Sequence, residues 1–256
     1  MLTNIKKLDN ILISNDDGFD SIGINLLKNI AMNLSDNVII VAPKDNQSAK
    51  GRSISLNKKI KFIKNNKYEW VIEGTPTDCI IFALNHIMKN NKPDLILSGI
   101  NAGGNIGDEV SYSGTVAASW EGALRGIKSI ALSQVAGTDS LKSYDYVKNF
   151  GLQIINYIIN LDDIEQTMLF NVNFPNSINF NRKDFLFTKL SNQKRSDEIF
   201  LDRNNQYFEI GKMLISNDFN INSDLYAIKN NKISITPLTI DLTNFDNLNF
   251  LINKNN

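Results

Sequence analysis

The residues best suited to chemistry lie in three polar loops, each of which directly follows a predicted buried strand. In the first loop, residues 14–18 (SNDDG), the carboxylates of Asp16 and Asp17 stand side by side. Hard divalent cations such as Mg²⁺, Mn²⁺ and Ca²⁺ prefer oxygen ligands of this kind, so the pair is a candidate metal site. Asn, Asp and Gly are also ordinary turn residues, and a plain turn is the alternative interpretation.

The second and third loops add groups that suit an anion. Residues 42–53 form a long basic loop that could close over a phosphate or carboxylate, with Ser48 supplying an oxygen, although an ordinary solvated loop is the alternative. Residues 98–115 are rich in glycine and end on Ser-Gly-Thr (113–115) at a predicted helix N-terminus. The unpaired N–H groups and the positive dipole end of such a terminus attract anions. A glycine-rich connection with a Ser or Thr cap is the alternative here.

Several familiar signatures are missing from the sequence. It contains no G-x-G-x-x-G, no G-x-x-x-x-G-K-[ST] and no G-x-S-x-G, which disfavours a dinucleotide-binding oxidoreductase, a P-loop protein and a serine hydrolase. The single histidine, His86, falls inside a predicted helix and is interpreted as structural. Cys79, just inside a predicted helix start, is interpreted as a small packed apolar residue.

The elements that must position these loops follow an alternating pattern. Continuous apolar runs predict strands covered on both faces, and helical spacing of apolar residues separates them, as in an α/β protein with a mostly parallel sheet. Ligands of such a sheet bind at the carboxyl ends of the strands, where the three loops begin. The predicted strands are 10–14, 38–42, 94–98, 129–133 and 168–174, with a hairpin at 59–64 and 68–72 and helices at 22–34, 75–88, 115–126 and 146–160.

The pattern changes after about residue 180. We expect strands at 184–190, 206–210, 225–229 and 232–237, the last two joined into a hairpin by Asn230 and Asn231, and a final helix over 244–252. Residues 1–180 are therefore expected to form the α/β core. Residues 181–256 are expected to be a β-rich, oligomerising extension of the same domain.

Composition excludes several classes of protein. The chain has 256 residues, 42% of them hydrophobic, and 27 basic residues balance 27 acidic ones. Neutrality leaves no general footprint for a nucleic acid duplex or an anionic membrane, and the apolar runs are too short to cross a bilayer. One cysteine cannot form an internal disulfide, and the start has no signal-peptide core. We expect a cytoplasmic protein.

Six segments, taken together and in order, resemble the SurE survival-protein family of metal-dependent nucleotide phosphatases. They span residues 11 to about 243, and their order and spacing make coincidence a poor explanation. The segments are ILISNDDGFDSIGI, VAPKDNQSAKGRSISL, GTPTDC, PDLILSGINAGGNIGDEVSYSGTVAASWEGALRGIKSIALS, NVNFP and SITPLTIDLT.

The resemblance implies a Rossmann-like three-layer α/β/α core with a C-terminal β-hairpin exchanged between subunits, giving homodimers or homotetramers. It implies a phosphoric monoester hydrolase, a 5′/3′-nucleotidase that cleaves nucleoside monophosphates with one Mg²⁺ or Mn²⁺ per subunit. The implied metal ligands are Asp16, Asp17, Ser48 and Asn101, and Asp16, Asp17 and Asn101 are also the implied catalytic residues. The implied phosphate-binding residues are Asn105, Ser113, Gly114 and Thr115.

Two positions depart from the family pattern. Members usually carry Ser-Gly where this chain has Ser48-Ala49, which affects a turn that favours glycine. Many members also have a histidine where this chain has Thr239, so a general acid worth about 10²–10⁴-fold in rate is missing if that histidine protonates the leaving group. The alternative function is therefore a metal- and nucleotide-binding oligomeric regulatory protein with weak or no turnover.

Overall fold

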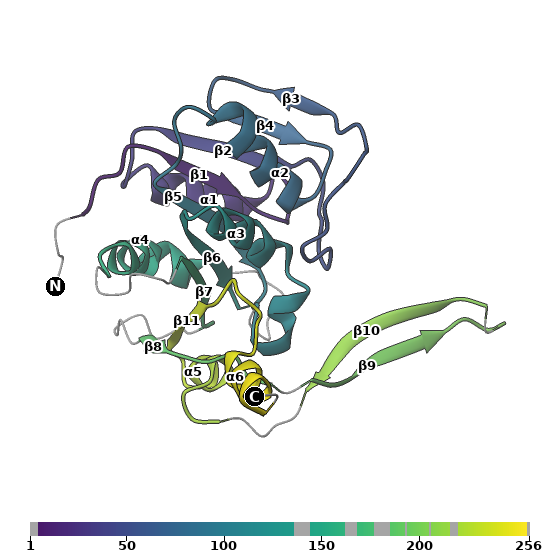
Figure 1. Cartoon of the computed structure of the whole chain (residues 1–256). Coiled ribbons are helices and arrows are strands. Elements are labelled where there is room, and N and C mark those ends of the chain that lie inside the picture. The colour runs from purple at the N-terminus through teal and green to yellow at the C-terminus, as the bar shows by residue number, and fades with distance from the viewer. Residues whose placement is uncertain are drawn as a thin grey trace.

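A nine-stranded mixed sheet forms the centre of the computed structural model, which describes residues 5–135, 144–161, 168–176, 185–192, 194–204, 206–215 and 220–254 (Figure 1). The strand order is β3-β4-β2-β1-β5-β6-β7-β11-β8. All neighbours are parallel except the pairs β3–β4 and β7–β11. The strands are β1 (Ile11–Ser14), β2 (Val38–Pro43), β3 (Phe62–Lys64), β4 (Glu69–Ile72), β5 (Leu95–Ala102), β6 (Lys128–Gln134), β7 (Leu169–Phe174), β8 (Phe185–Phe187) and β11 (Ile233–Leu238).

Helices cover both faces of this sheet, which confirms the predicted three-layer α/β/α class. The first face carries α1 (Ile22–Ala31) and α4 (Asp145–Ile159), whose apolar side chains form one core cluster with the strands. The second face carries α2 (Pro76–Phe82), its π-helical continuation Ala83–Ile87, and α3 (Gly114–Leu124). Residues of β1, β2 and β7 are buried along their whole length, as the continuous apolar runs of β1 and β2 predict.

The helix starts agree with local capping chemistry. Thr75 and Asp78 form a capping box at the start of α2, with Pro76 in the first turn. The Ser21 hydroxyl caps α1 and the Ser113 hydroxyl caps α3, each by accepting a backbone N–H three residues later. These caps place the first turns of α2 and α3 at the carboxyl edge of the sheet.

The C-terminal part differs from the sequence prediction at one element. Residues predicted as a strand over 225–229 form the helix α5 (Asp224–Lys229), so the predicted hairpin with 232–237 is wrong, although β11 itself is present. The alternation of apolar residues there was real, but the Ser223 cap, whose Oγ accepts the Tyr226 N–H, starts a helix instead. The final helix is α6 (Phe245–Lys254), close to its predicted position.

A hairpin is nevertheless present, formed by residues N-terminal to the predicted one. Strands β9 (Lys194–Leu201) and β10 (Phe208–Ile215) pair antiparallel and project from the body of the molecule (Figure 1). The prediction included only the start of β10 and missed β9, whose first half is charged. The expected boundary between residues 180 and 181, and Asp184 at the start of one predicted strand, lie outside the described residues.

Within the described ranges, no helix combines the length and the apolar character needed to cross a membrane.

Candidate active site

The three polar loops meet at the carboxyl edge of the sheet, around β1. In the sheet β1 lies between β2 and β5. The connection that follows β1 leads to β2, whereas the connection that follows β5 leads to β6 on the other side, so the two diverge and open a crevice at the ends of β1 and β5. The Gln47 N–H donates to the backbone oxygen of Asp16 at 2.7 Å, which joins the first loop to the second. The Ala102 N–H donates to Asp17 Oδ2 at 3.1 Å, which joins the first loop to the third.

Asp16 is the most constrained of these residues. Its side chain is 4% exposed, and its Oδ1 accepts a short hydrogen bond from the Thr115 hydroxyl at the start of α3. Burial raises the pKa of the Asp16 carboxyl, an effect that the Thr115 hydrogen bond opposes and the neighbouring Asp17 charge reinforces. A partly desolvated carboxylate held in one orientation is a good metal ligand and a candidate base.

The first turn of α3 packs directly against this carboxylate. A Cβ added at Gly114 would lie 2.7 Å from Asp16 Cβ and 2.9 Å from Asp16 Oδ2. Only a glycine therefore allows the helix start to approach so closely. The result is a helix N-terminus, capped by Ser113, beside a carboxylate at the end of β1. Opposing charges thus lie together: the positive end of α3 and the Asp16–Asp17 pair.

Ser48 and Asn101 are chain neighbours of the residues that contact Asp16 and Asp17, because Ser48 follows Gln47 and Asn101 precedes Ala102. The Asn101 side-chain amide donates to the Gly103 backbone oxygen at 2.9 Å, so its Oδ1 is the atom left for a ligand. Ser48 is exposed, and its N–H donates to Asn46 Oδ1 at 2.8 Å. The next residue, Ala49, has φ of +59°, so the turn after Ser48 does adopt the conformation that favours glycine.

Asn105 belongs to a separate, buried amide network. Its N–H donates to Asn173 Oδ1 and its side chain to Ser133 Oγ, each at 2.8 Å. The side chains of Asn171 and Asn173 in turn donate to the Asn105 backbone oxygen, at 2.8 and 3.1 Å. Sequence reasoning missed these two β7 residues as supports of the site. The detectable signal was a pair of asparagines two positions apart in an otherwise apolar strand.

The far end of the glycine-rich loop is held by Asp224, the first residue of α5. This carboxylate is fully buried and accepts the N–H groups of Gly107 at 2.7 Å and Ser191 at 2.9 Å. Sequence reasoning missed Asp224 because it assigned its neighbours to a strand. The contact fixes the loop that carries Asn101 and Asn105 against the C-terminal part of the chain.

A pocket of about 470 Å³ lies beside α3, on the side of Ala117 and Trp120. Arg52, from the second loop, lies over the Trp120 ring, 4.5 Å from its centroid. Thr239 also lines this pocket, and its hydroxyl donates to the Asp241 backbone oxygen at 3.1 Å. The residue that departs from the family pattern therefore lies in a cavity next to the helix start that Asp16 contacts.

The donor set suits a hard divalent cation. Among the described residues no hydrogen bond is donated to Asp17 Oδ1 or to Asn101 Oδ1, which leaves both oxygens uncommitted. Two carboxylates, an amide oxygen and a hydroxyl form an all-oxygen set of the kind that Mg²⁺ and Mn²⁺ prefer. In the same ranges no group of three or more His, Cys, Asp or Glu that could hold a metal ion is present.

Comparisons with known proteins show which family the chain resembles in sequence and fold. Residues 11–197 match the family model described as "Survival protein SurE". A protein named 5′-nucleotidase SurE from Paramagnetospirillum magneticum is 38% identical over 94% of this chain and 94% of its own length. A protein of the same name from Azorhizobium caulinodans is 40% identical over 91% of this chain and 93% of its own length. The crystal structure of the SurE protein from Aquifex aeolicus covers 96% of this chain and 100% of its own, with a TM-score of 0.82 and 30% identity.

Proposed function

The chain belongs to the SurE family, and from this premise we propose that it is a metal-dependent 5′/3′-nucleotidase that hydrolyses nucleoside monophosphates to nucleoside and phosphate. The observation that carries the proposal is the contact between Asp16 and the first turn of α3. It joins an acidic oxygen cluster, suited to a cation, to a helix N-terminus, suited to a phosphate. Relatives named 5′-nucleotidase SurE support the choice of substrate.

The oxygen atoms of Asp16, Asp17, Ser48 and Asn101 would hold one Mg²⁺ or Mn²⁺ per subunit. Such a cation, when bound, supplies polarisation of the phosphate and of a water molecule. Asp16 is also placed to act as a base, because it is a buried carboxylate held in one orientation by Thr115. Thr115 donates to Asp16 Oδ1, so Oδ2 of the same carboxylate is the oxygen left to face the ligand or accept a proton.

The substrate phosphate would bind at the start of α3. The backbone N–H of Gly114 lies in the first turn, where no helical carbonyl pairs with it, and it would stabilise charge that grows on the phosphoryl oxygens. Ser113 sets the direction of this turn through its cap. The hydroxyl of Thr115 donates to the Asp16 carboxylate and its backbone N–H also interacts with that carboxylate, so Thr115 would meet the phosphate beside Asp16. Asn105 is held by hydrogen bonds to β6 and β7, and its side-chain amide would add a further polar group to the phosphate site.

The test is phosphate release from AMP and GMP with Mn²⁺ or Mg²⁺, with and without EDTA. We expect release only with metal, and a loss on the order of 10²-fold or more in kcat for Asp16→Asn, which keeps the size of the side chain. Asp20→Asn is the matched control, because Asp20 is an exposed carboxylate in the same loop and should be neutral. Near-normal activity of Asp16→Asn at saturating metal would contradict its role.

The alternative function is a metal- and nucleotide-binding oligomeric regulatory protein with weak or no turnover. It is supported by Thr239, which leaves the pocket beside α3 without the histidine that many relatives carry. The same assay separates the two functions, because tight AMP binding without phosphate release would support the regulatory protein. Partial rescue of a slow rate by Thr239→His would assign the deficit to the missing general acid.

We also propose that the β9–β10 hairpin is exchanged between subunits in a homodimer or homotetramer. Phe200, Leu201, Phe208 and Ile210 are 55–66% exposed on its two strands, and an exposed apolar arm is typical of an interface. Light scattering after chromatography should give a multiple of the 28.8 kDa chain mass, and Phe200→Glu with Phe208→Glu should reduce it. A cytoplasmic location is part of the proposal, and the buried thiol of Cys79 supports a reducing compartment.

A further inference from the structure

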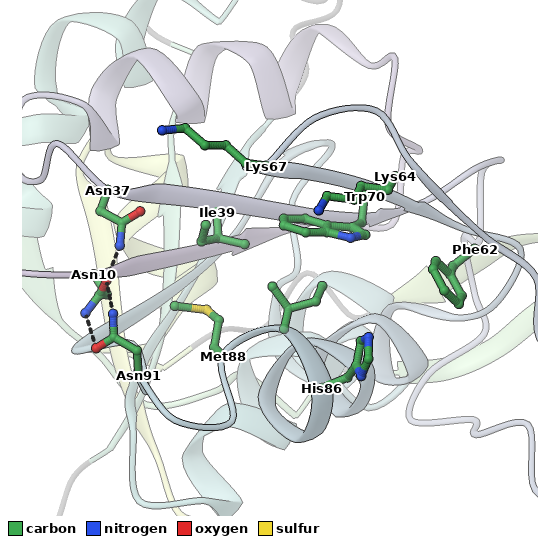
Figure 2. A pocket seen from close by; sticks show the side chains of 11 residues that line it. Asn10, Asn37, Ile39, Phe62, Lys64, Lys67, Trp70, His86, Met88 and Asn91 are labelled. Carbon is green, nitrogen blue, oxygen red and sulfur yellow. Dashed lines mark hydrogen bonds between the residues drawn. The ribbon is translucent and has the colours of Figure 1, made fainter.

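A second cavity lies near the amino ends of the strands, whereas the candidate active site lies at their carboxyl ends. Its volume is about 420 Å³, and it opens between the strands β1–β4 and the π-helical turn Ala83–Ile87 (Figure 2). Asn10 and Asn37, which line it, precede β1 and β2, so it adjoins the amino ends of the strands. The metal and phosphate residues follow the carboxyl ends of the same strands. The two sites are therefore separate.

The walls of this cavity form an apolar slot. Ile39 and Trp70 lie on the sheet side and face Met88 on the helix side (Figure 2). These three residues are only 4–7% exposed, so packing in the hydrophobic core fixes the positions of their side chains. Aromatic and thioether side chains favour contact with a flat ring. A pocket of this size that combines an apolar wall with polar groups at its ends is typical of a small-molecule site.

The charges at the rim are all of one sign. Lys64 and Lys67 line the cavity, and no carboxylate does. Lys64 Nζ lies 5.5 Å from the centroid of the Trp70 ring, which brings the positive charge to the aromatic wall. In the described parts of the chain neither lysine forms an ion pair. An anionic group on a ligand would therefore find two uncompensated ammonium groups.

The remaining end of the cavity is an amide cluster. Asn10 and Asn91 exchange two hydrogen bonds of 3.1 Å, and the Asn37 amide also donates to Asn10 Oδ1 (Figure 2). Asn10 Oδ1 accepts two of these bonds and has no lone pair left, whereas Asn37 and Asn91 each keep a second donor hydrogen and further acceptor capacity. Asn91 is exposed and can turn its free edge to a ligand. Paired donors and acceptors of this kind match the hydrogen-bonding edge of a nucleobase.

We propose that this cavity is a second nucleotide-binding site, which takes a nucleoside monophosphate without hydrolysing it. The base lies in the slot between Trp70 and Met88 with its edge toward the asparagines. The phosphate lies against Lys64, and Lys67 adds positive charge at the rim. The residues that would hold a cation are all at the other edge of the sheet, so binding here needs no metal. The proposal stands on the lining of this cavity and does not depend on hydrolysis at the candidate active site.

The two tryptophans of the chain allow a direct test. Trp120→Phe leaves Trp70, in the wall of the cavity, as the sole tryptophan reporter. AMP is titrated into this variant in EDTA while tryptophan fluorescence is recorded. We expect saturable quenching, about tenfold or more weaker binding after Lys64→Ala with Lys67→Ala, and similar weakening after Asn91→Asp, which adds a negative charge. Lys58→Ala with Lys59→Ala is the control of equal charge, since both lysines are exposed and neither lines the cavity.

Two further ligands and one further variant are measured in the same titration. Adenosine should bind about tenfold or more weaker than AMP, and inorganic phosphate should displace AMP poorly, because each presents only half of the required chemistry. Asp17→Asn should leave the quenching unchanged, which separates this site from the candidate active site. No saturable quenching, or equal affinity in the two lysine pairs, would overturn the proposal. Loss of quenching in Asp17→Asn would do so as well, by assigning the signal to the first site.

Discussion

Gly114→Ala tests the contact on which the proposed active site depends. The backbone of Gly114 has no positive φ, so alanine is acceptable to the helix, and only the neighbours oppose it. The added Cβ would lie 2.7 Å from Asp16 Cβ, 2.9 Å from Asp16 Oδ2 and 3.1 Å from Pro76 Cγ. Real Cβ atoms essentially never come within 3.0 Å of such atoms. The Asp16 side chain and the start of α3 must therefore move apart by several tenths of an ångström.

The expected loss is larger for activity than for stability. Overpacking of a buried contact costs about 1–3 kcal/mol in the free energy of unfolding, which alanine's helix propensity, better than that of glycine by about 1 kcal/mol, partly offsets. A misplacement of about 1 Å in a reacting group costs on the order of 10²-fold in rate. Because the shift here is somewhat smaller, we expect kcat/KM for AMP to fall roughly 10- to 100-fold. The net cost of up to about 2 kcal/mol should lower the melting temperature by at most about 8 °C.

The assay measures kcat/KM for AMP at saturating Mn²⁺ together with thermal unfolding. Gly151→Ala is the matched control, because Gly151 lies in the interior of α4 and its added Cβ would meet only the ends of Ile30 and Val147, at 3.0 and 3.2 Å. That variant should keep its activity. If Gly114→Ala retains wild-type kcat/KM while its stability falls, the helix start is packed against Asp16 for structural reasons alone and the catalytic argument fails.

Three further predictions concern the surrounding scaffold. Ala49→Gly should raise the free energy of unfolding in urea by about 0.5–1 kcal/mol, because Ala49 has φ of +59°; an unchanged value would mean that this turn is unstrained. Asp224→Ala should cost at least about 3 kcal/mol by leaving buried N–H groups unpaired, and Asp224→Asn less, both read from thermal unfolding. Burial raises the pKa of Tyr144 to about 12 from 10.0, so stability should fall as pH rises across that interval. Tyr144→Phe should remove this part of the alkaline slope in urea titrations, and an unaltered slope would contradict the assignment.

Much of the core followed from local pattern. Continuous apolar runs predicted β1 and β2, and the Thr75–Asp78 capping box predicted the start of α2, because such signals depend on a few neighbouring residues. The same locality explains the error at α5. Leu225–Lys229 alternates like a strand, and its helical state depends on the Ser223 cap and on contacts of Asp224 with loops far away in the chain.

The sequence by itself determined which groups are present: adjacent carboxylates after β1, an amide near the end of β5 and a capped helix start at α3. Only the tertiary structure decided how these groups are used. Thr115 and Asp16 are 99 positions apart, yet their side chains share a hydrogen bond that orients the carboxylate. Asn105 is held by β7 asparagines 66 and 68 positions further on. Periodicity cannot report such pairs, because they arise only when parallel strands bring distant loops to one edge of a sheet.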